Sequence, residues 1–222
     1  HIKLLTDYEK TLNTETVIEF NQKTPYQKYN FMKIGTGSLG GKARGLAFAA
    51  DKLKNSKISK KYPNINIRVP NIIVIATDEF DLFMNKNKLW DIALNEPDNK
   101  KLIKYFLNAK LDRKLIKNIT ALLKKTLYPL AIRSSSLSED SQYQSLSGMY
   151  STFMLPNNSE SLQERVDQVS EAIKRIYAST FFVAPKSLIN KISHRIEEEK
   201  MAIIIMEMTG KNHTNRFYPT FS

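Results

Sequence analysis

The chain has 222 residues, a formal net charge of +12 and no cysteine. This length suits one large domain or two small lobes, and the lack of cysteine excludes disulfides and cysteine-based metal sites. No apolar run approaches the roughly 20 residues of a membrane-spanning helix. The first residues lack the apolar core of a signal peptide, so we predict a cytoplasmic protein.

The positive charge is compatible with a nucleic acid, an anionic membrane face or a small anionic ligand. The lysines are scattered through predicted helices, and the sequence has neither an arginine-rich strip nor the aromatic strand signature of an RNA-binding sheet. We therefore assign most of the charge to solvated surface and expect no nucleic-acid or membrane partner. A basic nucleic-acid-binding module remains an alternative that rests on charge alone.

Residues 1–30 have mixed polarity and little periodicity, which predicts a lead-in or a linker from an upstream region. The last part of this stretch and the residues after it, Tyr26 to Ile34, are too polar to predict a buried parallel strand.

Gly35 to Leu53 is the most informative stretch, with five glycines in eleven residues followed by an alanine-rich helical pattern. Glycine lets a backbone turn tightly and approach a ligand closely. The start of a helix offers unpaired N–H groups and a positive dipole end, which suit an anion. With the charge of Lys42 added, the stretch predicts a phosphate-binding loop; the alternative is a flexible linker followed by a helix.

Three known loop patterns compete for this stretch. Gly35, Gly37 and Gly40 match the G-x-G-x-x-G pattern of dinucleotide sites, but that pattern requires a preceding strand. A Walker A loop requires different glycine spacing and a Ser or Thr where Ala43 stands. The protein-kinase loop requires a valine at the position of Lys42.

The middle of the chain alternates apolar runs and helical patterns. Val69 to Ala76 predicts a strand buried on both faces. Thr77 to Glu79 predicts an N-cap and an acidic first turn for the next helix. Two further helices are expected over residues 99–108 and 112–126, each with one apolar face.

Pro129 to Arg133 predicts a short strand that delivers Arg133 to the start of a serine-rich turn. The arginine offers a planar set of donors that matches phosphate oxygens, and the serine hydroxyls can close around the same anion. Glu139 and Asp140 are interpreted as turn carboxylates rather than metal ligands.

Ser145 to Pro156 predicts a small-residue loop around Gly148, followed by an alternating strand. Ser159 is expected to cap a long amphipathic helix, and Pro185 to occupy the first position of another. His194 in that last helix is expected to be a surface residue.

Met201 to Gly210 predicts a strongly apolar strand that ends in a Met-Glu-Met-Thr turn. Backbone groups at such an end could pair with an adenine base, and methionines could form soft apolar walls. A central strand that simply ends at the surface is the alternative.

Taken in order, these segments resemble the N-terminal nucleotide-binding domain of the phosphoenolpyruvate synthase and pyruvate phosphate dikinase family. The likeness rests on Gly37–Ala47, Leu130–Ser141 and Ser145–Leu155, with support from Val169–Phe181 and Met201–Met208. It implies an α+β fold built of α/β-type lobes, the N-terminal part of an ATP-grasp-like domain, with a mixed sheet flanked by helices over residues 31–222.

The resemblance also implies an ATP-dependent phosphotransferase. Its members split ATP to AMP and phosphate and pass a phosphoryl group through a histidine on another domain to an acceptor such as pyruvate. By this likeness Lys42 and Arg133 are catalytic and contact the nucleotide phosphates. The residues implied in nucleotide binding are Gly40, Gly41, Lys42, Arg133, Ser134, Ser147, Gly148, Glu207, Met208 and Thr209.

Two departures from the family pattern bear on activity. The family's magnesium ligands follow the segment matched by Met201–Met208, so none is assigned here, and Mg²⁺ ligands are expected downstream. There is also no Thr-Ser-His-Gly stretch for a phosphohistidine. We therefore expect the domain to be incomplete at its C-terminus and inactive alone. A catalytically silent ATP-binding regulatory domain is the alternative.

Overall fold

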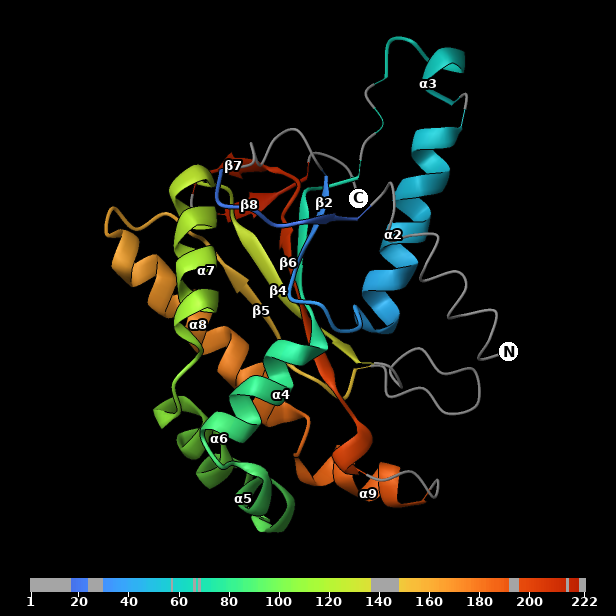
Figure 1. Ribbon diagram of the computed structural model, residues 1–222. Coiled ribbons are helices and arrows are strands. Elements are labelled where there is room, and N and C mark those ends of the chain that lie inside the picture. The colour runs from blue at the N-terminus through green and yellow to red at the C-terminus, as the bar shows by residue number, and fades with distance from the viewer. Residues whose placement is uncertain are drawn as a thin grey trace.

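A six-stranded mixed sheet forms the centre of the computed structural model (Figure 1). In spatial order its strands are β1 (Ile18–Glu19), β2 (Phe31–Ile34), β3 (Ile72–Ile75), β6 (Met201–Glu207), β4 (Leu130–Ser136) and β5 (Thr152–Leu155). The structure describes residues 17–23, 30–56, 58–65, 67, 69–136, 148–191, 196–214 and 216–219.

The sheet is parallel on one side and antiparallel on the other. β1, β2 and β3 run parallel, whereas β6 is antiparallel to both β3 and β4, and β5 is antiparallel to β4. The two central strands, β3 and β6, read IIVI and MAIIIME, and their aliphatic residues are buried almost completely. Continuous apolar runs of this kind form strands that are covered on both faces.

Helices cover both faces of the sheet (Figure 1). On one face α2 (Gly40–Asn55) packs through Leu39, Ala43 and Ala47. The other face carries the larger core with α4 (Thr77–Lys86), α5 (Trp90–Asn95), α6 (Asn99–Asn108), α7 (Arg113–Lys125) and α8 (Leu162–Ser179). The remaining elements are α3 (Ile58–Lys61), α9 (Val183–Lys191), the 3-10 turn η2 (Ile196–Glu198) and the hairpin of β7 (Lys211–His213) and β8 (Arg216–Tyr218).

This mixed α/β architecture, a mixed sheet flanked by helices, confirms the predicted fold class and is consistent with an ATP-grasp-like domain. The helices expected over residues 99–108 and 112–126 are α6 and α7. Their N-caps are Asp98 and Asp112, whose carboxylates accept hydrogen bonds from first-turn amides. None of the helices in the described ranges is long and apolar enough to cross a bilayer.

Three predicted helix starts are wrong by one or two residues. The N-cap of α4 is Ala76 rather than Thr77, and no side chain caps it. Ser161 caps α8 through the amide of Glu164, whereas the Ser159 hydroxyl bonds to the Glu164 carboxylate. Pro185 is the third residue of α9 rather than its first. For α4 and α8, several small or polar residues near the start could serve as the N-cap.

Two strand predictions also need correction. The prediction that Tyr26 to Ile34 is too polar for a buried parallel strand is wrong, because Phe31–Ile34 forms β2, which pairs in parallel with β3 and buries Phe31, Met32 and Ile34. The sheet even begins earlier, since β1 pairs with β2. The strand expected over 129–133 continues through Ser136, so the first three serines belong to β4 and are buried.

Candidate functional site

The glycine loop lies between the end of β2 and the start of α2 and is held by α4. Asp78 accepts hydrogen bonds from the amides of Thr36 (2.8 Å) and Gly37 (3.0 Å) and from the Thr36 hydroxyl (3.1 Å). The next amide, that of Ser38, donates to the Thr77 hydroxyl at 3.0 Å, and the Thr77 amide donates back to the Ser38 carbonyl at 3.0 Å. Two adjacent residues of α4 therefore define the path of the loop.

The hydrogen bonds also set the charge state of Asp78. Its burial acts to raise the pKa, but the bonds from Thr36 and Gly37 favour the ionised form, and the net result is a pKa below the ordinary value. Asp78 is therefore a carboxylate at neutral pH. Its acceptor capacity is directed at the loop.

Ser135 of β4 holds the other end of the loop. Its hydroxyl donates to the carbonyl of Leu39 at 2.9 Å and accepts from the amide of Ala43 at 3.0 Å. The Gly40 amide donates to the Ser38 hydroxyl at 3.3 Å. Two of the first four amides of α2 are thus bonded within the protein, so the helix start offers fewer amides to an anion than the sequence suggested.

The glycine at position 40 is required by this packing. It has φ +74°, and a Cβ there would collide with the backbone carbonyl of Ser135. The close approach that requires a glycine here is therefore to β4, and the contact of Gly40 with a nucleotide stays a prediction. The packing of Gly40 on β4 also brings the start of α2, with Lys42, against that strand.

Lys42 lies at the start of α2, half-buried, with its Nζ 3.5 Å from the hydroxyl of Ser134. Arg133, also half-buried, precedes Ser134 in β4. The structure therefore brings together three residues of the predicted phosphate site, although 91 positions or more separate Lys42 from the others in sequence. Within the described residues, the Arg133 side chain has no hydrogen-bonding partner.

Arg133 lies on the face of the sheet that carries α2. It pairs with Ile204 of β6, which packs against α2, and residues paired directly across two strands share one face. On β5 the paired residue is Thr152, and Met154 follows two positions along the same face. Thr152 is exposed and Met154 is 60% exposed, so α2 leaves this part of the sheet uncovered.

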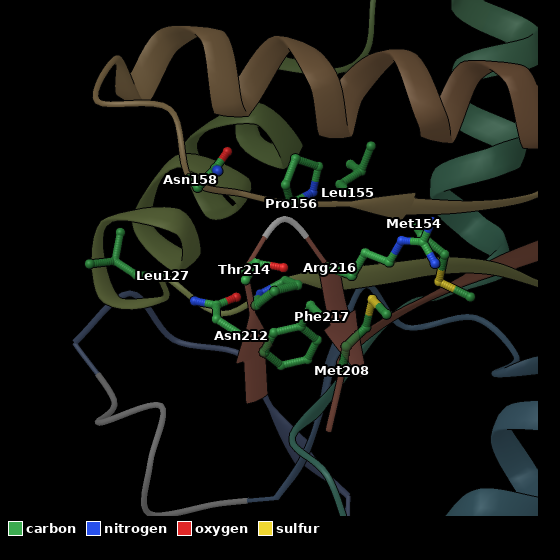
Figure 2. Close-up of a pocket in the computed structure, with 11 residues that line it drawn as sticks. Leu127, Met154, Leu155, Pro156, Asn158, Met208, Asn212, Thr214, Arg216 and Phe217 are labelled. Atoms are coloured by element: carbon green, nitrogen blue, oxygen red, sulfur yellow. The ribbon is translucent and has the colours of Figure 1, made fainter. Parts of the chain in front are cut away.

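A pocket of about 540 Å³ lies at the end of this uncovered strip (Figure 2). Met208, Arg216 and Phe217 line one side, and Leu155 and Pro156 line the other. The remaining lining residues are Leu127, Pro129, Met154, Asn158, Asn212 and Thr214. Apolar walls with a few polar groups are typical of pockets for small molecules.

The predicted adenine segment is only partly placed at this pocket. Met208 lines it, but Glu207 is buried and its carboxylate accepts a hydrogen bond from the Asn71 side chain at 2.8 Å. The amides of Glu207 and Met208 donate to the carbonyls of Asn71 and Pro129, so in this conformation they do not face a ligand. Thr209 is exposed just beyond β6.

The small-residue loop before β5 is described only from Gly148, which has φ +78° and is exposed. Because β5 pairs Thr152 with Arg133 and runs antiparallel to β4, the chain enters β5 from the Arg133 end of the site. Ser147, Glu139, Asp140 and His194 lie outside the described residues. Over the described ranges, no three His, Asp or Glu side chains cluster in a way that could hold a metal ion.

The structure is thus an α/β domain in which Lys42 lies beside β4, the strand that carries Arg133, and in which a pocket of apolar and polar side chains lies along the same sheet. A family model described as the AMP/ATP-binding domain of pyruvate phosphate dikinase matches residues 36–215. The chain belongs to this family, and it is the ATP/AMP-binding part of an enzyme of the pyruvate phosphate dikinase type. No curated protein matches it.

Several residues of the site were not predicted from the sequence. Asp78 and Ser135 hold the loop, and Met154, Arg216 and Phe217 line the pocket. The sequence around Asp78 predicts only a helix start, and it does not indicate that Asp78 binds Gly37, 41 residues away. The run of serines predicts a turn near the anion, whereas Ser135 lies buried in β4.

Proposed function

We propose that this chain binds ATP along the uncovered strip of the sheet, as the nucleotide-binding part of an ATP-dependent phosphotransferase. The phosphates would contact Lys42 and Arg133, with Ser134 and the segments at Gly40, Gly41, Ser147 and Gly148 beside them. The base would lie near the Met208 pocket, next to Glu207 and Thr209.

One observation carries the proposal, namely the register of β4 against β6 and β5. It places Arg133 on the α2 face, and Ala131, two residues earlier, pairs with Met206 of β6 and Met154 of β5 on the same face. Two residues along a strand span about 6.6–6.8 Å. An extended ligand lying along β4 could therefore reach from the methionines to the cations.

The chemistry expected of this region is electrostatic. An arginine presents a planar fork of donors that matches phosphate oxygens, and a lysine supplies a compact charge that can follow a phosphate. Together they would orient the polyphosphate and offset its charge. By resemblance, the reaction would give AMP and phosphate through a phosphohistidine on another domain, with a pyruvate-like acceptor. Because no three His, Asp or Glu side chains cluster over the described ranges, we propose no magnesium site on them.

The proposal is tested by calorimetric titration of the protein with ATP. Charged hydrogen bonds contribute about 1.5–3 kcal/mol each, so Lys42→Ala and Arg133→Ala should each weaken ATP binding at least about tenfold. Lys52→Ala, in the last turn of the same helix, and Arg175→Ala, at a half-buried residue of α8 that pairs with Glu171, are the matched controls and should bind ATP like the wild type.

The alternative is a basic nucleic-acid-binding module, which rests on the net charge alone. Titration with a mixed-sequence RNA at two salt concentrations tests it. Binding through many phosphates weakens steeply with salt. Salt-sensitive RNA binding without ATP binding, or equal ATP affinity in all four variants, would contradict the proposed site.

A further inference from the structure

The loop that leads to Lys42 is attached to α4 by five hydrogen bonds. Three hydrogen bonds join Thr36 and Gly37 to the Asp78 carboxylate, and two more join Ser38 to Thr77. We propose that Asp78, assisted by Thr77, is a positioning residue for phosphate binding. This inference rests on the proposed function, because it concerns how the same site is held ready for its ligand.

The glycines of the loop support a specific fit to Asp78. At Gly37 a Cβ would lie 2.6 Å from the amide nitrogen of Asp78, and at Gly35, where φ is +94°, it would collide with the Asp78 carboxylate. Both glycines are therefore explained by the approach of the loop to α4. The loop contacts Asp78 so closely that a larger residue than glycine does not fit at position 35 or 37.

Asp78 can position the phosphate site without touching a phosphate. An ionised carboxylate would repel a polyphosphate, but its hydrogen bonds are directed to the amides of the loop. Ordering a loop before binding lowers the entropy cost that the ligand must otherwise offset. Because the loop runs directly into α2, holding residues 36–38 also holds the helix start on which Lys42 stands.

The two ends of the loop are bound to different elements. Ser135 ties Leu39 and Ala43 to β4, whereas Asp78 and Thr77 tie residues 36–38 to α4. Removing the Asp78 carboxylate leaves the β4 contacts in place. We therefore expect Asp78→Ala to fold, and to lose order in the loop rather than in the core.

The experiment compares Asp78→Ala and Asp78→Asn with Asp98→Ala. Asp98 is a matched control, since its carboxylate also accepts bonds from two backbone amides, at the start of α6 and away from the loop. Titrations use ATP and inorganic tripolyphosphate, and thermal unfolding is recorded for each variant. Asp78→Ala should weaken both ligands about tenfold, Asp78→Asn should recover part of this loss, and Asp98→Ala should change only the melting temperature.

Equal ligand affinities for wild type, Asp78→Ala and Asp98→Ala would overturn the positioning role. Hydrogen exchange of the backbone amides supplies a readout that does not need a ligand. Asp78→Ala should speed exchange at Thr36, Gly37 and Gly40, whose amides are hydrogen-bonded within the loop or to Asp78, and unchanged exchange at Gly40 would also overturn the inference. If the wild type binds no ATP, the proposed function fails, while the exchange data still decide whether Asp78 holds the loop.

Discussion

At the scale of single residues, two glycines of α2 lie in opposite environments. Gly40 has a positive φ, and its α-carbon lies against the backbone of Ser135, where no side chain fits. Gly45 is exposed on the surface of α2, and a Cβ there would have nothing within 4 Å. One glycine is thus needed by the fold and the other only lowers helix stability.

We therefore predict opposite effects for two identical substitutions. Gly40→Ala should destabilise the protein by about 3 kcal/mol or more, because it combines backbone strain with a collision. Gly45→Ala should stabilise it by about 0.5–1 kcal/mol, since alanine favours a helix interior. Urea unfolding of both variants checks this. A Gly40→Ala variant as stable as the wild type would show that the loop does not pack on β4 in this way.

At the scale of elements, an aromatic cluster joins the helices on the large face of the sheet. Tyr177 of α8 contacts Phe80 and Phe83 of α4, with ring centroids 5.0 and 5.4 Å apart, and Phe106 of α6 and Phe181 complete the contacts. The Tyr177 hydroxyl is buried and has no hydrogen-bonding partner among the described residues. Burial first, and then the nearby Glu79 charge, raise the pKa of this tyrosine well above its usual value.

A second buried tyrosine offers a matched comparison. The Tyr150 hydroxyl donates to the Glu199 carboxylate at 3.1 Å, and both residues are buried. Tyr177→Phe should leave stability unchanged or raise it by up to about 1 kcal/mol, because it removes an unpaired polar group. Tyr150→Phe should lower it by about 1–3 kcal/mol, because Glu199 loses a hydrogen bond in the interior. Equal losses in thermal unfolding would contradict the assignment of the Tyr177 hydroxyl.

The connection between α7 and β4 shows how a buried charge can join elements. Arg165 of α8 is buried, and it donates to the carbonyls of Leu123 (2.9 Å) and Thr126 (3.2 Å) at the end of α7. The Asn157 amide also donates to the Thr126 carbonyl, at 3.0 Å. A cation at this position satisfies carbonyls that a helix end leaves unpaired and also complements the helix dipole.

At the scale of the whole molecule, acidic groups around α4 give stability a pH dependence with two opposing parts. Hydrogen bonds, chiefly those from Lys114 and Lys86, lower the pKa of Asp112, and the pKa of Asp78 is lowered as well. A carboxyl with a lowered pKa contributes stability above its unfolded-state pKa and loses it as the pH falls through the folded-state value. Both groups therefore favour the fold at neutral pH and cease to do so in acid.

Glu79 acts in the opposite direction. Burial, followed by the charges of Asp78 and Asp112, raises its pKa, and its Oε2 is buried without a partner among the described residues. A raised pKa means that the folded state binds the proton more tightly, so this contribution is present below the unfolded-state pKa and is lost as the pH rises through the folded-state value. The ionised Glu79 thus opposes folding at neutral pH.

The prediction is that Glu79→Gln stabilises the protein at pH 7, with a gain that shrinks as the pH falls towards 4, where the wild-type carboxyl becomes protonated. Melting temperatures of both proteins across this range supply the measurement. Glu160→Gln, an exposed carboxylate before α8, serves as the control. A gain that grows on acidification, or no gain at any pH, would contradict the environment assigned to Glu79.

Much of the architecture followed from local patterns. Apolar runs without alternation predicted β3 and β6, helical spacing predicted α6, α7 and α8, and five ordered segments pointed to the family that the comparison confirmed. These signals are local, because the periodicity of a strand or helix can be recognised within a short stretch of sequence. Short strands such as β2 were not predicted, because four residues show too little periodicity to be recognised among polar neighbours.

The tertiary structure alone decided which residues meet. The bonds from Thr36 and Gly37 to Asp78, from Ala43 to Ser135 and from Asn71 to Glu207 join positions between 41 and 136 residues apart. No periodicity links such pairs, because they are brought together by strand order and register. By itself, the sequence determined the main helices and the long apolar strands, the family and the residue types able to bind phosphate. The packing of α2 and α4 against the sheet decided that Gly40 packs on β4, that Asp78 binds the loop, and that Lys42 contacts Ser134, the residue next to Arg133.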